Sequence, residues 1–322
     1  MKVLGIRPVV FAAAMLVTTL APVAAQEWPT RNVTVVVPIP AGVASDIIAR
    51  VVFEQVGKQV GQNFVIENRT GAGGTIGANI VAKAAPDGHT ILVYGSIAAS
   101  NALYSHLPYD TLNDFTPTVL FGQTPLVVTT GAGRYKTLAE LVAAGKAKPG
   151  ALNYSTVGIG SAAHFGAERL AVSAGFTAQH VPFKGGEWLT EVIAGRLDFT
   201  VPPVTTAIGA IRDGKMVALA ISAEKRISSL PDVPTMIEAG LTADAIYPFY
   251  TGCYLPAKTP RAIVDKLHDE VTKALAVPSV QERLVKLGVE PMPMTVAQFQ
   301  DFFKKDVAAN LALVKAANIP VQ

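Results

Sequence analysis

Two short turns carry residue types and spacings that favour anion binding. The first turn (residues 38–43, Pro-Ile-Pro-Ala-Gly-Val) precedes Ser45 and Asp46, and the second turn (residues 157–161, Val-Gly-Ile-Gly-Ser) ends at Ser161. We predict that each turn starts a helix, with Ser45 or Asp46 as the first N-cap and Ser161 as the second. Because a helix start leaves backbone N–H groups unpaired at its positive end, each turn is expected to bind a carboxylate. For either turn alone, the alternative is a helix start whose N–H groups are satisfied only by the turn itself and by water.

The elements that position these turns alternate between strands and helices. Residues 33–37 form an unbroken β-branched run, which predicts a strand buried on both faces, as in a parallel α/β sheet. Residues 152–156 precede the second turn in the same way. Ligands of such sheets bind outside the carboxyl ends of the strands. The 322 residues, half of them hydrophobic, are enough for two lobes. We therefore expect an α/β fold of two lobes with both turns facing a shared cleft.

The residues that could support catalysis or metal binding are poorly arranged for either. Ser161 and His164 lie three residues apart on one predicted helix turn, where their side chains are parallel neighbours rather than a nucleophile and a base. The sequence has no G-x-S-x-G motif and no H-x-x-x-H or C-x-x-C spacing. We therefore predict that the protein is not an enzyme and uses neither a cofactor nor a metal ion.

A glycine cluster at residues 71–77 (Gly-Ala-Gly-Gly-Thr-Ile-Gly) admits two interpretations. One is a dinucleotide-binding loop, but the spacing is not G-x-G-x-x-G and no acidic residue follows the next predicted strand at 90–94. The preferred interpretation is a loop whose glycines allow tight packing against a neighbouring segment.

The N-terminal residues resemble a secretory signal. Lys2 and Arg7 precede an apolar run at 9–20, and small residues end at Ala25. Cleavage near Ala25 would release a soluble, exported chain, which we expect in the periplasm. The single cysteine, Cys253, lies far from that site, so neither a disulfide framework nor a lipidated cysteine is expected.

The charge of the mature chain argues against nucleic-acid and membrane-surface partners. Removing residues 1–25 takes away Lys2 and Arg7 and leaves 25 basic against 24 acidic residues. Binding to nucleic acid or anionic lipid needs clustered Lys and Arg. We predict that neither is a partner.

Seven motifs, spread in order along the mature chain, resemble one family. They are VPIPAGVASD (37–46), ENRTGAGG (67–74), AAPDG (84–88), LPYD (107–110), KPG (148–150), VPFKGG (181–186) and LPDVPT (230–235). Together they resemble the Bug family, the extracytoplasmic solute receptors of tripartite tricarboxylate transporters. The resemblance implies a type II-like periplasmic binding protein fold, whose two lobes close on a small carboxylated ligand with the help of bound waters. It also implies delivery of that ligand to membrane permease subunits.

The resemblance also implies the residues that bind the ligand. By position, they are Pro40, Ala41, Gly42 and Val43 with Asp46 as the cap, Ser96 at another strand end, and Gly160, Ser161 and His164. Two departures from the family pattern matter. Val43 replaces a usual second glycine, and residues 199–203 are not followed by the acidic residue that amino-acid binders often have. We therefore predict a non-amino dicarboxylate or an aromatic carboxylate as the ligand.

The lobe boundaries follow from the order of the predicted elements. We expect residues 26–124 and 250–322 to form lobe 1 and residues 125–249 to form lobe 2 of a monomer. A helix from 296 with Phe299, Phe302 and Phe303 should support lobe 1. Two other functions remain open: a binding component that signals to a membrane sensor, and, less favoured, an exported enzyme on the same scaffold.

Overall fold

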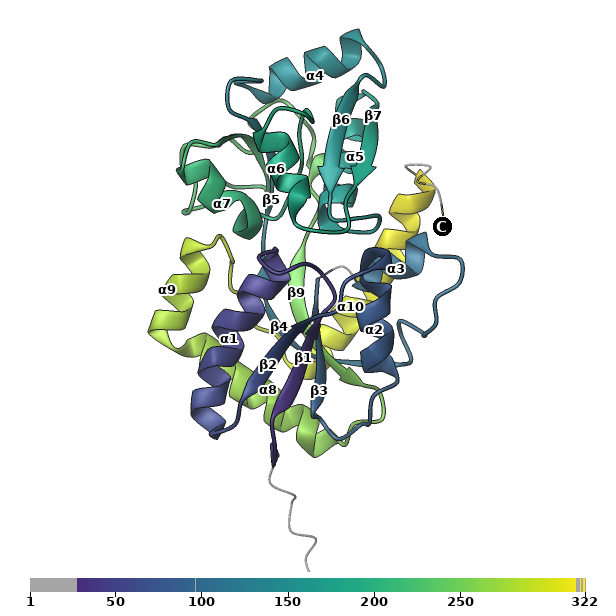
Figure 1. Cartoon of the computed structure of the whole chain (residues 1–322), viewed down its shortest axis with the longest axis vertical. Coiled ribbons are helices and arrows are strands. Elements are labelled where there is room, and N and C mark those ends of the chain that lie inside the picture. The colour runs from purple at the N-terminus through teal and green to yellow at the C-terminus, as the bar shows by residue number, and fades with distance from the viewer. Residues whose placement is uncertain (1–27, 96, 317–318, 320, 322) are drawn as a thin grey trace, which may run out of the picture.

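Two lobes lie one above the other in the structure, a computed structural model that describes residues 28–95, 97–316, 319 and 321 (Figure 1). The proposed signal segment 1–25 and Ser96 lie outside the described residues. Within the described part of the chain, no helix is long and apolar enough to cross a membrane. The alternation of strands and helices confirms the predicted α/β class.

A mixed sheet forms the centre of the first lobe. Among the described residues it has five strands, in the order β2 (Phe64–Asn68), β1 (Val33–Val37), β3 (Thr90–Tyr94), β9 (Tyr250–Pro256) and β4 (Phe115–Gln123). β1 runs parallel to β2 and β3, whereas β9 runs antiparallel to β3 and β4. All of β1 except Thr34 is buried. The unbroken apolar run therefore forms the predicted central strand, and its carboxyl end points toward the other lobe (Figure 1).

Helices cover both faces of this sheet. They are α1 (Ala44–Val60), η1 (Ala72–Gly74), α2 (Thr75–Ala82), α3 (Ile97–Leu103), α8 (Arg261–Ala276), α9 (Pro278–Lys286) and α10 (Val296–Ala316). α1 packs against α8 and α9, and α10 packs against β4 and α3. Phe299 and Phe303 of α10 are buried in the core of the first lobe, where Phe299 contacts Tyr250 and Tyr254. The prediction that this helix supports the first lobe is confirmed.

Two strand pairs form the sheet layer of the second lobe. β5 (Leu126–Gly131) and β8 (Met216–Ser222) are antiparallel, and β6 (Leu152–Thr156) and β7 (Ala178–Pro182) are parallel. Isolated bridges from Phe199 to Tyr154 and from Thr200 to Thr129 join the pairs. The surrounding helices are α4 (Leu138–Ala147), α5 (Ala162–Ala174), α6 (Glu187–Ile193), α7 (Val204–Arg212) and η2 (Ala243–Ala245). The second turn thus leads from β6 to α5 as predicted.

The chain crosses between the lobes in two neighbouring segments. It leaves the first lobe after β4 and enters the second at β5, and it returns into β9. The two crossings touch, because Thr124 N donates a hydrogen bond of 2.8 Å to the carbonyl oxygen of Phe249. We keep lobe boundaries at 124/125 and 249/250 as a proposal.

Candidate ligand-binding site

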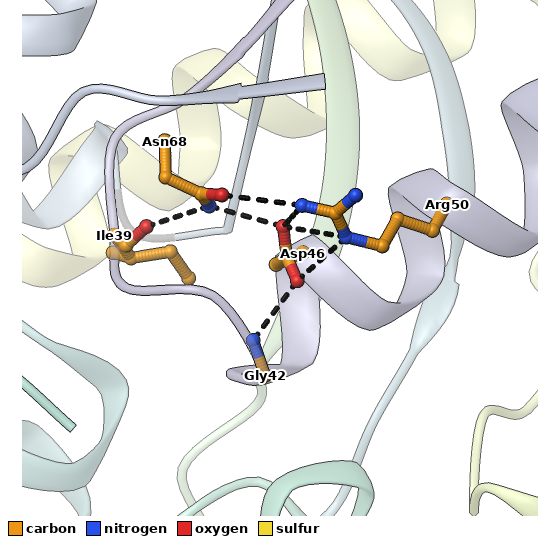
Figure 2. A network of polar contacts seen from close by, with 5 residues as sticks. All are labelled: Ile39, Gly42, Asp46, Arg50 and Asn68. Atoms are coloured by element: carbon orange, nitrogen blue, oxygen red, sulfur yellow. Dashed lines mark hydrogen bonds and ion pairs between the residues drawn. The ribbon is translucent and has the colours of Figure 1, made fainter. Parts of the chain in front are cut away.

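The first turn is capped differently from our prediction. Helix α1 begins at Ala44, and Val43 occupies the N-cap position without a side-chain hydrogen bond. The prediction of Ser45 or Asp46 as the N-cap is therefore wrong, since both residues lie inside the first helical turn. Asp46 instead reaches back and accepts a hydrogen bond of 2.9 Å from Gly42 N (Figure 2). An acidic side chain at the third helical position can satisfy an amide before the helix in this way.

Asp46 is the buried centre of a polar network that holds the first turn in place. Its carboxylate accepts hydrogen bonds of 3.0 Å from Arg50 Nε, Arg50 Nη2 and Asn68 Nδ2 (Figure 2). Asn68 Nδ2 also donates to the carbonyl oxygen of Ile39 at 3.0 Å. Burial alone would raise the pKa of Asp46, but the hydrogen bonds from Arg50, Gly42 and Asn68 together outweigh it and lower the pKa below its ordinary value. Asp46 therefore positions the turn as an ionised, internally paired group.

Several amides of the first turn already have partners in the protein. Gly42 N donates to Asp46, and Val43 N donates to the Pro40 carbonyl at 3.4 Å. Ala44 N donates to Thr206 Oγ1 of α7 at 3.0 Å, which is a contact between the lobes. The first helix start thus offers fewer amides to a ligand than the sequence pattern suggests.

The second turn has the cap that the sequence predicts. Ser161 Oγ accepts a hydrogen bond of 3.3 Å from His164 N and donates one of 2.8 Å to the Gly158 carbonyl. Ala162 and Ala163 then begin α5, and their amides belong to the first helical turn, whose N–H groups have no partner within the helix. The prediction of Ser161 as N-cap is confirmed.

His164 lies behind the second turn in a stack of rings. Its ring centroid is 4.3 Å from that of His180, and Tyr154 stacks on His180 at 4.9 Å. Burial and the neighbouring His180 lower the pKa of His164 to about 3, and burial lowers the pKa of His180 to about 4. His164 is therefore neutral at pH 7, and its Nδ1 accepts a hydrogen bond of 3.3 Å from Gly160 N. Its role in the structure is to fix the glycine of the turn.

A cavity of about 250 Å³ lies between the two lobes. It is smaller than the ~300–1,000 Å³ typical of pockets for drug-sized ligands, so in this conformation it has room only for a small molecule. The first lobe contributes Pro38, Ile39, Pro40, residues 70–74, Tyr94 and Tyr104, and the second contributes Val157, Gly158, Ile159, Ser161, Pro182, Phe183 and Lys184.

A second cavity of about 20 Å³ adjoins the first. It shares Ile39, Tyr94, Val157 and Ser161 with the larger cavity and adds Val43, Ser45, Ala162, Ala163, Trp188, Pro203 and Phe249. This volume holds about one water molecule. The residues that start α1 and α5 thus meet at a space of about one water molecule, which shares Ser161 and three other lining residues with the larger cavity.

The predicted site residues divide into two groups. Pro40 and Ser161 line the larger cavity, and Val43 and Ser161 line the smaller one. The others are not among the lining residues: Ala41, Gly42, Asp46, Gly160 and His164. Asp46 and His164 hold the turns by accepting hydrogen bonds from Gly42 N and Gly160 N, whereas Ala41 is exposed. Ser96 lies outside the described residues. Sequence reasoning did not assign the 70–74 loop, Tyr94, Tyr104 or Lys184 to the site.

The glycine cluster forms a wall of the larger cavity. Gly73 and Gly74 have φ angles of +59° and +93°, which favour glycine. A Cβ atom on Gly74 would come within 2.7 Å of the Tyr94 ring, whose hydroxyl donates to the Gly73 carbonyl at 2.6 Å. The interpretation of these glycines as a tightly packed loop is confirmed. Among the residues that the structure describes, no group of three or more His, Cys, Asp or Glu is placed to hold a metal ion.

The fold and the cavity between its lobes define a periplasmic binding protein. The model of the "Tripartite tricarboxylate transporter family receptor" matches residues 48–319, and the chain belongs to this family. It is 34% identical, over 94% of its length and 92% of the relative, to the UPF0065 protein in the tcbD-tcbE intergenic region of Pseudomonas sp. (strain P51). The family predicted from the sequence motifs is confirmed.

Two solved structures share the whole fold. R. palustris Rpa4515 with adipate has a TM-score of 0.88 and 30% identity, and the match covers 92% of this chain and all of that one. MatC (Rpa3494) from Rhodopseudomonas palustris with bound malate has a TM-score of 0.84 and 34% identity, with 89% of this chain and all of that one covered. The predicted two-lobe binding-protein fold is confirmed, and the chain is a solute receptor of this family.

Proposed function

We propose that this receptor binds a small carboxylate between its lobes in the periplasm and delivers it to the permease subunits of a tripartite tricarboxylate-type transporter. The observation that carries the proposal is the cavity of about 250 Å³, whose lining includes Ser161, the N-cap of α5. Helix starts bind anions through backbone N–H groups. Binding by neutral donors avoids the desolvation of a buried protein cation.

The lining of the cavities favours an anion without an amino group. Among the described residues that line them, none is an aspartate or a glutamate. A ligand ammonium group would therefore lose its hydration without gaining a counter-charge. The rings of Tyr94, Tyr104 and Phe183 offer flat apolar surfaces, and burial raises the pKa of Tyr104, so its hydroxyl remains protonated.

We therefore propose a non-amino dicarboxylate or an aromatic carboxylate as the ligand. The adipate and malate bound to two relatives of the same fold support this class. We propose that Pro40, Val43 and Ser161 contact the ligand, and we keep Ser96 as a further candidate contact. Ala41, Gly42, Asp46, Gly160 and His164 would hold the two turns in position. We also propose that the receptor is monomeric and releases its ligand chemically unchanged.

Thermal-shift measurements on the purified mature chain test the ligand class. Saturation at 100 times the dissociation constant stabilises a protein by about 2.7 kcal/mol. In a chain of this length that corresponds to a rise of at least a few degrees in Tm. We expect shifts with C4 to C8 dicarboxylates, benzoates or pyridine carboxylates. Shifts only with aspartate, glutamate or a sugar would contradict the proposal.

Two further measurements test delivery and the absence of turnover. Deletion of the gene should abolish uptake of the identified acid, whereas a signalling component would change gene expression and leave uptake intact. Mass spectrometry of the acid after long incubation with the protein should recover it unchanged. Any new product would restore the enzyme hypothesis.

A further inference from the structure

Lys184 lies on the loop of the second lobe that follows β7, beside the second turn. β7 runs parallel to β6, with Pro182 opposite Thr156 at their carboxyl ends. Phe183 N continues this pairing through a hydrogen bond of 2.9 Å to the Thr156 carbonyl. The loop at 183–186 and the second turn therefore emerge side by side at one edge of the sheet, and both line the larger cavity.

Ser161 and Lys184 differ in depth along that cavity. Ser161 has only 6% of its surface exposed and lines both cavities. Lys184 is exposed and lines the larger cavity alone. The cavity therefore extends from a buried helix start to an exposed lysine at its mouth.

Lys184 is also the one charged side chain among the described residues that line either cavity. Within the described part of the chain, it forms no ion pair. Glu187 is the nearest acid along the sequence, and its carboxylate lies against Gly185. The ammonium group of Lys184 is therefore available to a ligand, and the lining offers no acid that would compete for it.

We propose that Lys184 is a specificity-determining residue that pairs with a second anionic group at the solvent end of the ligand. The site would then prefer dicarboxylates to monocarboxylates of the same carbon skeleton. This inference rests on the proposed function, in which the first carboxylate lies near Ser161. The flexible four-carbon stem of lysine places its charge over a range of positions, so ligands of different length can be paired.

The expected selectivity is modest because the pair is partly exposed to solvent. The largest contribution that an exposed ion pair usually makes to binding corresponds to about a fivefold change in affinity. Salt should reduce this contribution, because it screens exposed charges. Binding of the first carboxylate by enclosed amides should be much less sensitive to salt. The preference for dicarboxylates over monocarboxylates should thus decline as the ionic strength rises.

Calorimetric titrations with matched ligand pairs test the proposal on the mature chain. The pairs are succinate and butyrate, adipate and hexanoate, and terephthalate and benzoate. We expect the wild type to prefer a dicarboxylate, and Lys184→Met to weaken its binding about fivefold while leaving the monocarboxylate unchanged. Lys184→Arg should retain most of the preference. Lys148→Met is the control, because Lys148 is an exposed lysine of the same lobe outside the cavity.

The outcomes separate this inference from the proposed function. If the wild type binds no member of any pair and no acid of the thermal-shift panel, the proposed ligand class itself fails. If the wild type binds them but Lys184→Met changes the affinity for both members of a pair equally, or for neither, Lys184 does not set specificity. A wild-type preference for the monocarboxylate would also overturn the inference. Circular dichroism and Tm of the free variants should match those of the wild type, since the Lys184 side chain forms no ion pair within the described part of the chain that the substitution would remove.

Discussion

Gly73 of the first lobe lies directly against Ile159 of the second lobe. A Cβ atom on Gly73 would come within 2.3 Å of the Ile159 carbonyl oxygen and 2.7 Å of the Tyr104 hydroxyl. All three residues line the larger cavity. The lobes therefore approach each other at the cavity through a position where only glycine fits. If this cavity binds the ligand as proposed, a side chain at this position should weaken binding.

Gly73→Ala should weaken ligand binding by about tenfold. The added methyl group would overlap a backbone carbonyl of the other lobe, and overpacking of this kind costs about 1–3 kcal/mol. Calorimetric titration with the best acid of the thermal-shift panel measures the loss.

Gly61→Ala is the matched control for this substitution. Gly61 has a similar φ angle of +67°, but an added Cβ would meet no atom within 4 Å. It should lower the stability by about 1 kcal/mol through backbone strain alone and leave the affinity unchanged. Equal affinity losses in both variants would show that the contact with Ile159 does not matter for binding.

Asp46→Asn should destabilise the protein by about 1–3 kcal/mol at pH 7, because a buried acceptor of several hydrogen bonds is weakened. The folded-state pKa of Asp46 lies below its ordinary value of 3.8. The contribution of the ionised group is therefore fully present above about pH 4 and is lost as the pH falls through the folded-state pKa. Urea denaturation at pH 7 and pH 3 should show the difference from wild type shrinking. Asp232→Asn, at an exposed acid, should show no such pattern.

The His164 and His180 pair should make the protein sensitive to mild acid. Their folded-state pKa values are about 3 and about 4, below the ordinary 6.5. Since the unfolded chain takes up protons first, stability is fully present above pH 6.5 and falls between about pH 6.5 and 4. Each neutral histidine contributes a slope of about 1.4 kcal/mol per pH unit.

His180→Gln should remove about half of that slope, as measured by urea denaturation at several pH values. The expected change is in the pH dependence, whatever the effect on stability at pH 7. His106→Gln is the control, because His106 is exposed. An unchanged slope in His180→Gln would show that His180 does not remain neutral in the folded protein.

The sequence predicted the parts of the fold that depend on local pattern. The β-branched run at 33–37 forms the buried strand β1. Ser161 caps α5, because a serine directly before a helix can accept a hydrogen bond from an N–H group of the first helical turn. The first cap was missed because Val43 contributes no side-chain bond. Asp46 and Thr206 satisfy the amides on either side of it, and Thr206 comes from the other lobe.

The residues that line the cavity could not be predicted from the sequence either, because they too depend on contacts between the lobes. Gly73 and Tyr94 are far apart in the chain and meet within the first lobe, and Lys184 joins them at the cavity only because the two lobes approach each other. The motif that contains Lys184 was visible, but its role depends on the pairing of β7 with β6 and on the exposure of the loop. Local periodicity carries no information about which loops of two lobes will face each other.

Ser161→Asp should abolish the thermal shift that the best carboxylate produces. Aspartate is a good N-cap, so α5 should still form. Its charge, however, would lie at the end of the cavity where the ligand carboxylate is expected. Two like charges about 4 Å apart repel by about 4 kcal/mol at the effective dielectric near a protein surface. Thr137→Asp is the control, because Thr137 caps α4 of the same lobe in the same way, by accepting from Glu140 N at 3.2 Å, and lies outside the cavity. It should fold and bind as the wild type does. If Ser161→Asp folds and still binds the acid with wild-type affinity, the ligand carboxylate does not lie at the start of α5.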